Sequence, residues 1–324
     1  MTIFVLGPKQ LRLGVYLLIA LILTAGIIVG WKHLARQFIG VKMGVRLEEY
    51  PVGGLFPEEV AQVVKTMARR IDRDPQNACY FPETGEIIPA RTGRSVDVAA
   101  TVNMVCSAES GANLKVLISN IPPTVSEDFF KPVYHGKREV HRVALAINVA
   151  WGEEYIPALL KIFQEEKVKA TFFLVGTWIK TFPELVRSIE ATGHELGNHG
   201  LSHGHPSQMN REELKRLILE NTALMKSVTG KKPAALFAPP YGELTPSIVN
   251  TAGELGYRTI MWSVDSVDWK KPAPEIILQR ILAKIEPGGI ILLHPTVVTK
   301  AVMKDLIREL RKKGLEPGTV SSVL

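Results

Sequence analysis

Residues 197–206 read GNHGLSHGHP, which places His199 and His203 four positions apart. The glycines around Asn198 predict a strand that runs directly into a tight turn. Two imidazoles at this spacing can face one metal ion if the turn becomes helical. A histidine pair on its own is weak evidence for a metal site, because polar loops carry such residues as well. The interpretation therefore depends on the segments that the fold brings around this stretch.

From Arg142 to the C-terminus, short apolar runs alternate with amphipathic segments. The runs VALAINVA, ATFFLVG, HELGNHG, ALFAPPYG, YRTIMWSVDS and GGIILLH predict strands, and a final run lies near Thr319–Leu324. Apolar runs joined by helices indicate parallel strands buried on both faces. About seven such repeats favour an (α/β) barrel over an open sheet. The helices are expected around residues 154–166, 183–191, 211–228, 246–254, 274–285 and 300–313.

Three segments besides the histidine pair place reactive side chains at the ends of these strands, where barrels carry their chemistry. In LFAPPYG, two prolines would hold the Tyr241 N–H rigidly enough to stabilise an oxyanion. In MWSVDSVDW, Asp265 and Asp268 could orient a histidine, and Trp269 could stack on a sugar. His294 ends a buried strand, where an imidazole can act as a general acid. Each segment taken alone also has a purely structural interpretation: a strand-end loop, helix capping by aspartate, or a structural histidine.

In order and spacing, these segments resemble the polysaccharide deacetylases of carbohydrate esterase family 4, the NodB-homology domain, over residues 142–324. The resemblance implies a distorted (α/β) barrel that removes acetyl groups from chitin-like sugars, peptidoglycan or xylan with a divalent metal, usually zinc. It implies that His199 and His203 bind the metal and that His294 is the general acid. It further implies that the Tyr241 N–H donates to the oxyanion and that Asp268, with Asp265 beside it, tunes the general acid. Trp269, Leu293 and Pro240 would form the walls of the groove.

The chain departs from the family pattern at the first motif. Members usually carry TFDDG, with one aspartate as the base and the next as a metal ligand, whereas this strand reads AINVAWG. Asn148 stands at the base position, and an amide cannot accept the proton of an attacking water. Val149 stands at the metal carboxylate, and Ala238 stands where an arginine holds the base. The nearest acids are Glu153 and Glu154.

These departures leave three functions open: a working N-deacetylase with a rebuilt site, a catalytically inactive glycan-binding pseudoenzyme, and a structural envelope protein. In the first, Glu153, Glu154 or Asp265 would supply the missing carboxylate. The three replacements argue against ordinary deacetylation, because such groups act as one unit. The retained histidines and aspartates argue for it. With two histidines and no adjacent aspartate, any metal should be weakly held or completed by His205 or Asp265.

The INVAWG form resembles a sporulation-associated branch of the family in endospore-forming Gram-positive bacteria. That resemblance implies spore or cell-envelope peptidoglycan as the substrate context. Residues 38–125 should form a small α+β domain with a helix from Pro57 to about Arg70 and a hairpin at Thr84-Gly85. Its GGLFPEEV, TGRSVDV and PP segments resemble peptidoglycan-binding domains of envelope enzymes; a spacer is the alternative. Residues 126–141 read as a linker to the barrel at 142–324.

The N-terminal region predicts a membrane anchor. Residues 13–31 contain no charged side chain over 19 positions, which suffices to cross a bilayer. Apolar residues continue beyond the small residues at 24–26, which favours an uncleaved anchor within residues 1–37 over a cleaved signal peptide. Basic residues flank both ends of the span and leave its orientation open. The deacetylase resemblance places the bulk of the chain outside the cytoplasm, in a single-pass membrane protein.

Composition, net charge and cysteine content limit the number of domains and the kinds of partner that are expected. The 324 residues are 46% hydrophobic, enough for about two domains. The net charge of +7 fits a solvated surface or contact with an anionic envelope. No run of basic residues with interleaved aromatics occurs, so no nucleic-acid partner is expected. Cys79 and Cys106 could pair outside the cell or remain buried thiols.

Overall fold

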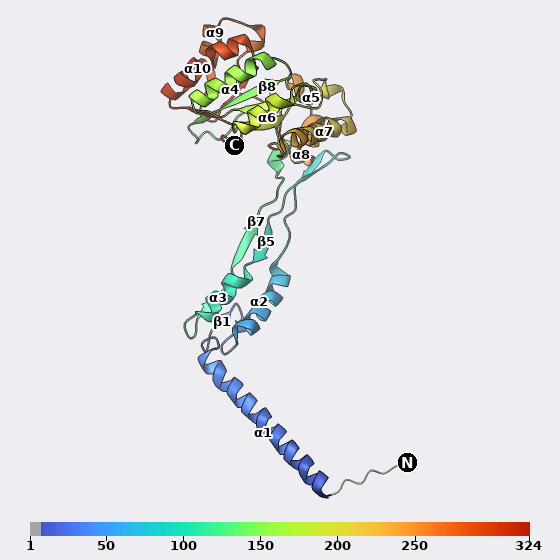
Figure 1. The fold of residues 1–324 in the computed structure, drawn as a ribbon, viewed down its shortest axis with the longest axis vertical. Coiled ribbons are helices and arrows are strands. Elements are labelled where there is room, and N and C mark those ends of the chain that lie inside the picture. Colours follow the sequence, from blue (N-terminus) through green and yellow to red (C-terminus); the bar gives the residue numbers. More distant parts are fainter. Residues whose placement is uncertain (1–7) are drawn as a thin grey trace, which may run out of the picture. The chain divides into compact units, whose positions relative to one another are not determined.

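The computed structural model describes residues 8–324, which divide into two compact units. The first unit comprises residues 8–76 and Arg91–Pro123, and the second comprises Asn77–Ala90 and Thr124–Leu324. The chain therefore passes between the units three times (Figure 1). The inserted piece is the expected hairpin, with β3 (Cys79–Phe81) antiparallel to β4 (Glu86–Ile88). It belongs to the second unit, and not, as expected, to the small domain at residues 38–125.

The first unit is a small α+β domain that follows the long helix α1. β1 pairs antiparallel with β2 and parallel with β6, and β5 pairs antiparallel with β7. Helix α2 begins at Pro57 as expected, and the Glu59 carboxylate accepts the Phe56 backbone N–H at 2.9 Å to close its first turn. The elements are α1 (Pro8–Phe38), β1 (Arg46–Leu47), β2 (Tyr50–Pro51), α2 (Pro57–Ile71), β5 (Gly93–Val96), α3 (Val98–Cys106), β6 (Asn113–Leu114) and β7 (Ile118–Ile121).

Helix α1 is long and apolar enough to cross a membrane over Arg12–Phe38, and the most apolar 18-residue window of that stretch is not buried inside the protein. Its last turn is tied to the start of α2. The Arg36 guanidinium donates to both carboxylate oxygens of Glu59, at 2.9 and 2.6 Å, and lies 5.0 Å from the centre of the Phe56 ring. This contact fixes where the apolar helix meets the folded domain.

The second unit is built on one parallel sheet of eight strands. Seven strands follow the order β12-β11-β10-β9-β8-β14-β13, and β15 pairs with the first half of β8. The strands are β8 (Arg142–Val149), β9 (Thr171–Leu174), β10 (Glu195–Asn198), β11 (Leu236–Phe237), β12 (Arg258–Thr259), β13 (Val264–Asp265), β14 (Ile290–Leu293) and β15 (Glu316–Gly318).

The connection between β12 and β13 forces this sheet to curl. The two strands are consecutive in the chain, yet they lie at opposite ends of the strand order. The residue steps from Thr259 to Val264 span at most about 18 Å, whereas the two edges of a flat sheet of this order would lie about 29 Å apart. The sheet therefore bends until its edges approach each other, which gives the distorted (α/β) barrel that the sequence predicted.

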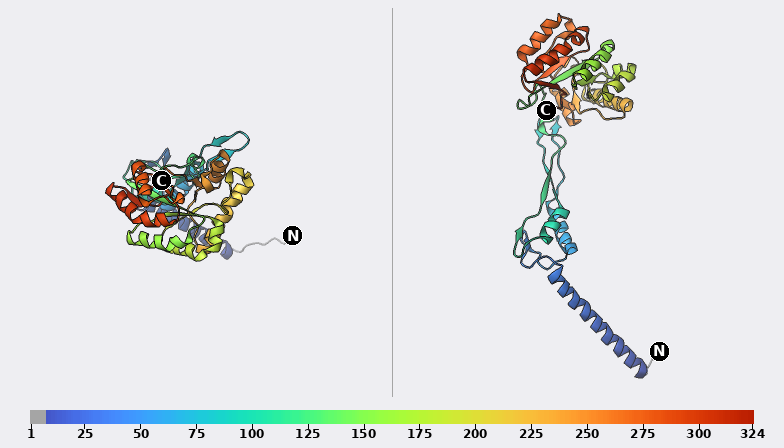
Figure 2. Two further views of the ribbon diagram at one scale, coloured as in Figure 1. Left: turned by 90° about the horizontal axis from the view of Figure 1, so that it is seen from above. Right: turned by 60° about the vertical axis from the view of Figure 1, so that its left-hand side comes forward.

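Helices cover the outside of the curled sheet (Figures 1 and 2). They contact one another in the order α9, α10, α4, α6, α7, α8. The expected helices are found with ends shifted by up to three residues, and α5 was not expected. Their bounds are α4 (Ile156–Glu165), α5 (Gly176–Thr181), α6 (Pro183–Ala191), α7 (Arg211–Thr229), α8 (Pro246–Glu254), α9 (Pro274–Lys284) and α10 (Val297–Lys312).

Side chains of β8 alternate between two cores, and this alternation positions the site. Leu145 and Ile147 are fully buried in the outer core between the sheet and the helices. Ala144 and Ala146 belong to the inner cluster, with Phe173. Successive side chains of a strand point to opposite faces. Because alanine side chains are small, they leave space inside the barrel at the carboxyl end of β8.

Four further expectations differ from the structure. The run YRTIMWSVDS forms two strands, β12 and β13, and the last strand is β15 at Glu316–Gly318, before the expected 319–324. The segment 126–141, expected as a linker, packs into the second unit: it contains the 3-10 turn η1 (Glu127–Phe130) and pairs Val133 with Ile260. Cys79 and Cys106 are exposed free thiols, neither paired nor buried.

Candidate functional site

A cavity of about 390 Å³ lies at the carboxyl ends of the central strands of the barrel. It collects residues from β8, β13 and β14 and from the loops that follow β10 and β11. Its lining includes most of the side chains that the sequence singled out. The lining residues are Asn148, Ala150, Trp151, His199, His203, Tyr241, Gly242, Trp262, Asp265, Trp269, Leu292 and His294.

His199 and His203 both line this cavity, as the sequence predicted. His199 follows β10 directly and is 2% exposed, and its Nδ1 lies 2.6 Å from the carbonyl oxygen of Ala238. Because a carbonyl only accepts, Nδ1 carries the proton and Nε2 keeps its lone pair. Burial lowers the pKa of His199 to about 3 and also lowers the pKa of His203. Both imidazoles are therefore neutral at physiological pH.

His294 is held by a buried carboxylate. Asp268 is 0% exposed; one of its oxygens faces His294 Nδ1 at 2.8 Å, and the other accepts the His294 backbone N–H at 2.6 Å. The Thr299 hydroxyl donates to that second oxygen at 2.5 Å. An imidazole held through Nδ1 by a carboxylate presents Nε2 to the cavity, which is the arrangement of a general acid or base. Thr299, at the start of α10, was not singled out in the sequence.

Tyr241 lies in the 3-10 turn η4 (Pro240–Gly242) with φ 58 and ψ 4, a left-handed conformation that is rare for a side chain of this size. Residues at the start of such a turn have no partner for their N–H inside it, which leaves the Tyr241 N–H available to a ligand. Its ring lies 4.3 Å from His203 and 4.5 Å from His205, centre to centre. These two rings contact the Tyr241 side chain. Pro240, expected as a groove wall, is buried beside it and is not among the described residues that line the cavity.

Three tryptophans wall the cavity, of which the sequence identified only Trp269. Trp151 stacks on His294 with ring centres 5.9 Å apart, and Trp262 contributes a further side. The sequence signal for Trp151 was its place directly after a buried strand. Leu293, expected as a wall, is instead 0% exposed in the outer core, and Leu292 lines the cavity. In β14, as in β8, neighbouring residues face opposite sides.

The three positions that depart from the family pattern differ in their surroundings. Asn148 lines the cavity at 7% exposure, and its Oδ1 has no hydrogen-bond partner within residues 8–324. Val149 is 0% exposed and lies in the outer core. Ala238 is buried in the inner cluster. Asp265 is the one carboxylate among the described residues that line the cavity, and it accepts the Val267 N–H at 2.8 Å.

The donor set fits a divalent metal only in part. Two neutral imidazoles face the cavity, but Val149 supplies no carboxylate. His205, a suggested third ligand, lies outside the cavity lining, with Nδ1 2.6 Å from Glu243. In the part of the chain that the structure describes, no three histidine, cysteine or acidic side chains gather closely enough to hold an ion. The residues present therefore lack the third ligand that a metal site of this family needs.

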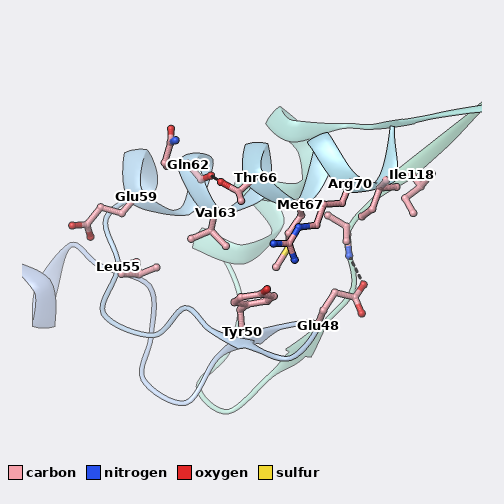
Figure 3. A pocket seen from close by; sticks show the side chains of 12 residues that line it. Glu48, Tyr50, Leu55, Glu59, Gln62, Val63, Thr66, Met67, Arg70 and Ile118 are labelled. Atoms are coloured by element: carbon pink, nitrogen blue, oxygen red, sulfur yellow. Dashed lines mark hydrogen bonds between the residues drawn. The ribbon is translucent and has the colours of Figure 1, made fainter. Parts of the chain in front are cut away.

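A second cavity, of about 570 Å³, lies in the first unit between α2 and the β1–β2 turn (Figure 3). Val63 and Met67 reach into it from α2, and Tyr50 faces them from the opposite side. The Arg70 guanidinium points into the same space, towards Tyr50 (Figure 3). The cavity therefore combines apolar walls, one aromatic ring, one cation and the carboxylates of Glu48 and Glu59.

Comparisons with known proteins agree with the fold. The sequence model of the polysaccharide deacetylase family matches residues 135–260. The uncharacterized protein YlxY of Bacillus subtilis is 34% identical over 252 residues, 77% of this chain and 78% of that protein. A peptidoglycan-N-acetylglucosamine deacetylase of Bacillus cereus is 34% identical over 188 residues, 56% of this chain and 87% of the enzyme.

Solved structures give the same result. A wild-type CE4 family pseudoenzyme from Bacillus anthracis is 32% identical, with a TM-score of 0.59 over 81% of this chain and 94% of the pseudoenzyme. A mutant of that pseudoenzyme with restored enzymatic activity is 30% identical, again with a TM-score of 0.59, and covers 81% of this chain and 97% of its own. The chain belongs to the polysaccharide deacetylase family.

Proposed function

We propose that this protein is a membrane-anchored envelope protein that binds peptidoglycan in its barrel cavity without carrying out the family's deacetylation. One observation carries the proposal: the side chain that lines the cavity at the base position is the amide of Asn148, and the next position, Val149, faces the core. An amide is not a proton acceptor at neutral pH. The cavity nevertheless keeps tryptophan and histidine side chains that a sugar could contact.

The cavity walls support glycan binding. Trp151 and Trp269 are 43% and 49% exposed. Trp151 stacks on His294 and Lys270 lies over the Trp269 ring, so a pyranose would stack on the remaining face of each tryptophan. His294 and the Tyr241 N–H offer hydrogen bonds from the two sides. Similarity to a peptidoglycan-N-acetylglucosamine deacetylase supports peptidoglycan as the glycan, and similarity to a family pseudoenzyme supports binding without turnover.

The proposal also covers how the protein is anchored to the membrane and where it is located in the cell. The apolar helix α1 supports a single-pass anchor with the two units outside the cytoplasm; a signal sequence near the N-terminus meets the same criterion of length and hydropathy. A sporulation-associated role rests on the INVAWG form of the first motif. The first-unit cavity supports residues 38–125 as a second peptidoglycan contact, because Tyr50 can stack on a sugar and Arg70 can pair with a stem-peptide carboxylate.

One observation favours a second candidate, a working N-deacetylase with a rebuilt base. Asp265 lines the cavity, so its carboxylate can reach a water held there. Glu153 and Glu154, the other candidates, lie in the 3-10 turn η2 (Glu153–Tyr155) and are absent from the described lining. A base at Asp265 would approach the acetyl group from a different strand than the family's base does.

The test compares binding and turnover in the full-length protein in detergent. We expect co-sedimentation with peptidoglycan sacculi and no acetate release above background, at neutral pH and with added zinc. Trp269→Ala should reduce sedimentation. Acetate release that disappears in Asp265→Asn would establish the second candidate instead. Failure to sediment with sacculi would remove the glycan-binding proposal.

A further inference from the structure

The first-unit cavity has a lining that is largely hydrocarbon. Figure 3 shows Val63 and Met67 pointing into it from α2, with Tyr50 facing them. A sugar or a stem peptide would use Tyr50 and Arg70 and would leave the apolar side chains without a partner. A ligand that fills the cavity therefore needs a hydrocarbon part. The apolar lining residues are Leu55, Val63, Met67, Ile71, Val116 and Ile118.

This cavity begins beside the last turn of α1. Glu59, which lines it, accepts hydrogen bonds from the Arg36 guanidinium at 2.9 and 2.6 Å, and Arg36 also donates to the Gly54 carbonyl at 3.0 Å. From Glu59 to Arg70, α2 rises by about 16 Å. One leaflet of a bilayer contains about 15 Å of hydrocarbon. The cavity is thus about as long as one lipid chain and begins next to the helix that is proposed to cross the membrane.

Positive charge gathers at the far end of the cavity. The Arg70 guanidinium points into the space (Figure 3) and has no ion-pair partner among the described residues. Arg73 and Arg94 lie directly opposite each other, and each donates its backbone N–H to the other's carbonyl oxygen, at 3.0 and 2.9 Å. Like charges in this arrangement repel each other. Neither guanidinium forms an ion pair within residues 8–324.

Arg94 stands on the side of β5 that faces the cavity. Val96 pairs with Ile118, which lines the cavity, and Arg94 comes two residues before Val96. Residues two apart in a strand, and residues opposite each other in an antiparallel pair, point to the same face. Arg94 therefore lies about 7 Å beyond Ile118 along the ribbon.

The acids beside this end do not pair with the arginines. Asp72 and Asp74 flank Arg73 in the sequence, and Glu48 lines the cavity. Glu48 and Asp72 accept backbone N–H groups, from Val116 at 3.1 Å and from Val96 at 2.7 Å. The guanidinium groups are thus left to bind an anion, and a guanidinium binds phosphate through two parallel N–H bonds.

We propose that the first-unit cavity binds a single-chain anionic lipid, with its hydrocarbon chain along α2 and its phosphate at Arg70, Arg73 and Arg94. The volume of about 570 Å³ suits one chain. The chain would leave one apolar surrounding for another, so the phosphate decides the affinity. Because the apolar end lies beside α1, a lipid can enter from the membrane without turning over. This inference rests on the proposed membrane anchor and gives the first unit a ligand other than peptidoglycan.

The experiment uses full-length protein in phosphatidylcholine vesicles. Three probes share a photoactivatable hexadecyl chain and end in phosphate, hydroxyl or trimethylammonium. After irradiation, mass spectrometry measures the ratio of cross-links on α2 to cross-links on α1, so that α1 reports membrane insertion in the same molecules. We expect this ratio to be about tenfold higher for the phosphate probe than for the trimethylammonium probe.

Variants separate the phosphate site from the apolar lining. Arg70→Glu should lower the ratio for the phosphate probe about tenfold and leave the ratio for the hydroxyl probe unchanged. Lys65→Glu makes the same change of charge at an exposed residue of α2 outside the lining and should change neither ratio. Val63→Trp fills the cavity and should lower the ratio for all three probes. Thermal unfolding checks that each variant is folded.

The outcomes distinguish this inference from the function on which it rests. Cross-links on α1 without any on α2, or equal ratios for the phosphate and trimethylammonium probes, would overturn the inference and leave the anchor standing. An Arg70→Glu protein that keeps its phosphate ratio but loses sedimentation with sacculi would assign the cavity to peptidoglycan and also overturn the inference. The absence of cross-links on both helices would overturn the anchor and the inference together.

Discussion

Asn148 and Val149 are adjacent in β8, yet their side chains lie on opposite faces of the sheet. Asn148 lines the cavity, and Val149 is packed between the sheet and the helices. In the family's usual first motif, both of these positions carry acids that act in one site. The structure therefore separates the two replacements: one changes the chemistry of the cavity, and the other belongs to the packing of the core.

This separation predicts the effect of restoring an acid at each position. Val149→Asp should destabilise the protein by about 3 kcal/mol or more, because it buries an unpaired carboxylate in an apolar core. Asn148→Asp, facing the cavity, should cost much less. Thermal unfolding of both variants, with and without added zinc, measures the difference. If zinc restores the stability of Val149→Asp, residue 149 reaches the histidines and the packing described here is wrong.

Of the two aspartates near the cavity, Asp268 should contribute much more to the free energy of unfolding than Asp265. Asp268→Ala removes the acceptor of the Thr299 hydroxyl and of both His294 N–H groups, which should cost about 3 kcal/mol. Asp265→Ala loses one bond, from the Val267 N–H, and should cost about 1 kcal/mol. Urea unfolding of the two variants makes the comparison. Equal losses would show that the Asp268 network contributes little to stability.

Stability should fall in mild acid because of His194. This residue is 6% exposed, lies 5.2 Å from both Phe163 and Phe172, and accepts the Ala170 N–H on Nδ1. Burial lowers its pKa from 6.5 to about 4. The unfolded chain therefore binds the proton first, and the stabilisation present above pH 6.5 is lost as the pH falls towards 4. At pH 5 the loss should be roughly 2 kcal/mol.

The variant His194→Asn tests this assignment, because its amide oxygen can still accept the Ala170 N–H but cannot titrate. Its midpoint of unfolding should change less than that of the wild type between pH 7.5 and pH 5. His199, whose pKa is lowered to about 3, contributes in the same direction and remains in both proteins. Parallel pH profiles for the two proteins would rule out His194 as a source of the loss.

Zinc should bind weakly. Two neutral imidazoles without a carboxylate form an incomplete ligand set, and anionic ligands contribute much of the affinity of mixed histidine–carboxylate sites. After dialysis against a chelator we expect well below one zinc ion per chain, and His203→Ala should abolish the remaining uptake. Stoichiometric zinc that survives the chelator would show that a third ligand moves into the site.

The full-length protein should fractionate with membranes through α1. Proteolysis from outside the cell should cleave the two units and leave the helix behind. As a control, a chain beginning at residue 38 should remain in the soluble fraction. A mature protein of wild-type cells that begins near residue 30 and is released from the membrane would identify α1 as a cleaved signal.

The sequence pattern was sufficient to predict the helices and strands, but it did not predict the face to which every side chain points. Helix α7 was expected at 211–228 and is found at Arg211–Thr229, because its ends carry strong local signals: an Asn210 cap and Gly230 with positive φ. Leu293 and Leu292 are equally apolar, so composition could not say which one faces the cavity. That depends on the register of β14 against β8, which is a property of the whole sheet.

The candidate site was predictable where a motif fixes both residue type and position. His199, His203, Tyr241, Asp265, Trp269 and His294 line one cavity as expected. Trp151 and Thr299 were not identified as site residues, because their roles arise from contacts across the chain. Trp151 stacks on His294, and Thr299 reaches Asp268 from the start of a helix. No local pattern encodes either contact.

The inserted hairpin has a consequence for how the protein is made. Asn77 accepts hydrogen bonds from Thr124 and Val125, and Ala90 donates to Glu127, so the hairpin belongs with residues synthesised later. During synthesis it emerges before any strand of the barrel and has to wait for α8, which it contacts, to follow. A protein that starts at residue 124 would contain every strand of the barrel but would lack the hairpin. The smallest complete barrel therefore cannot be obtained by trimming the chain from one end.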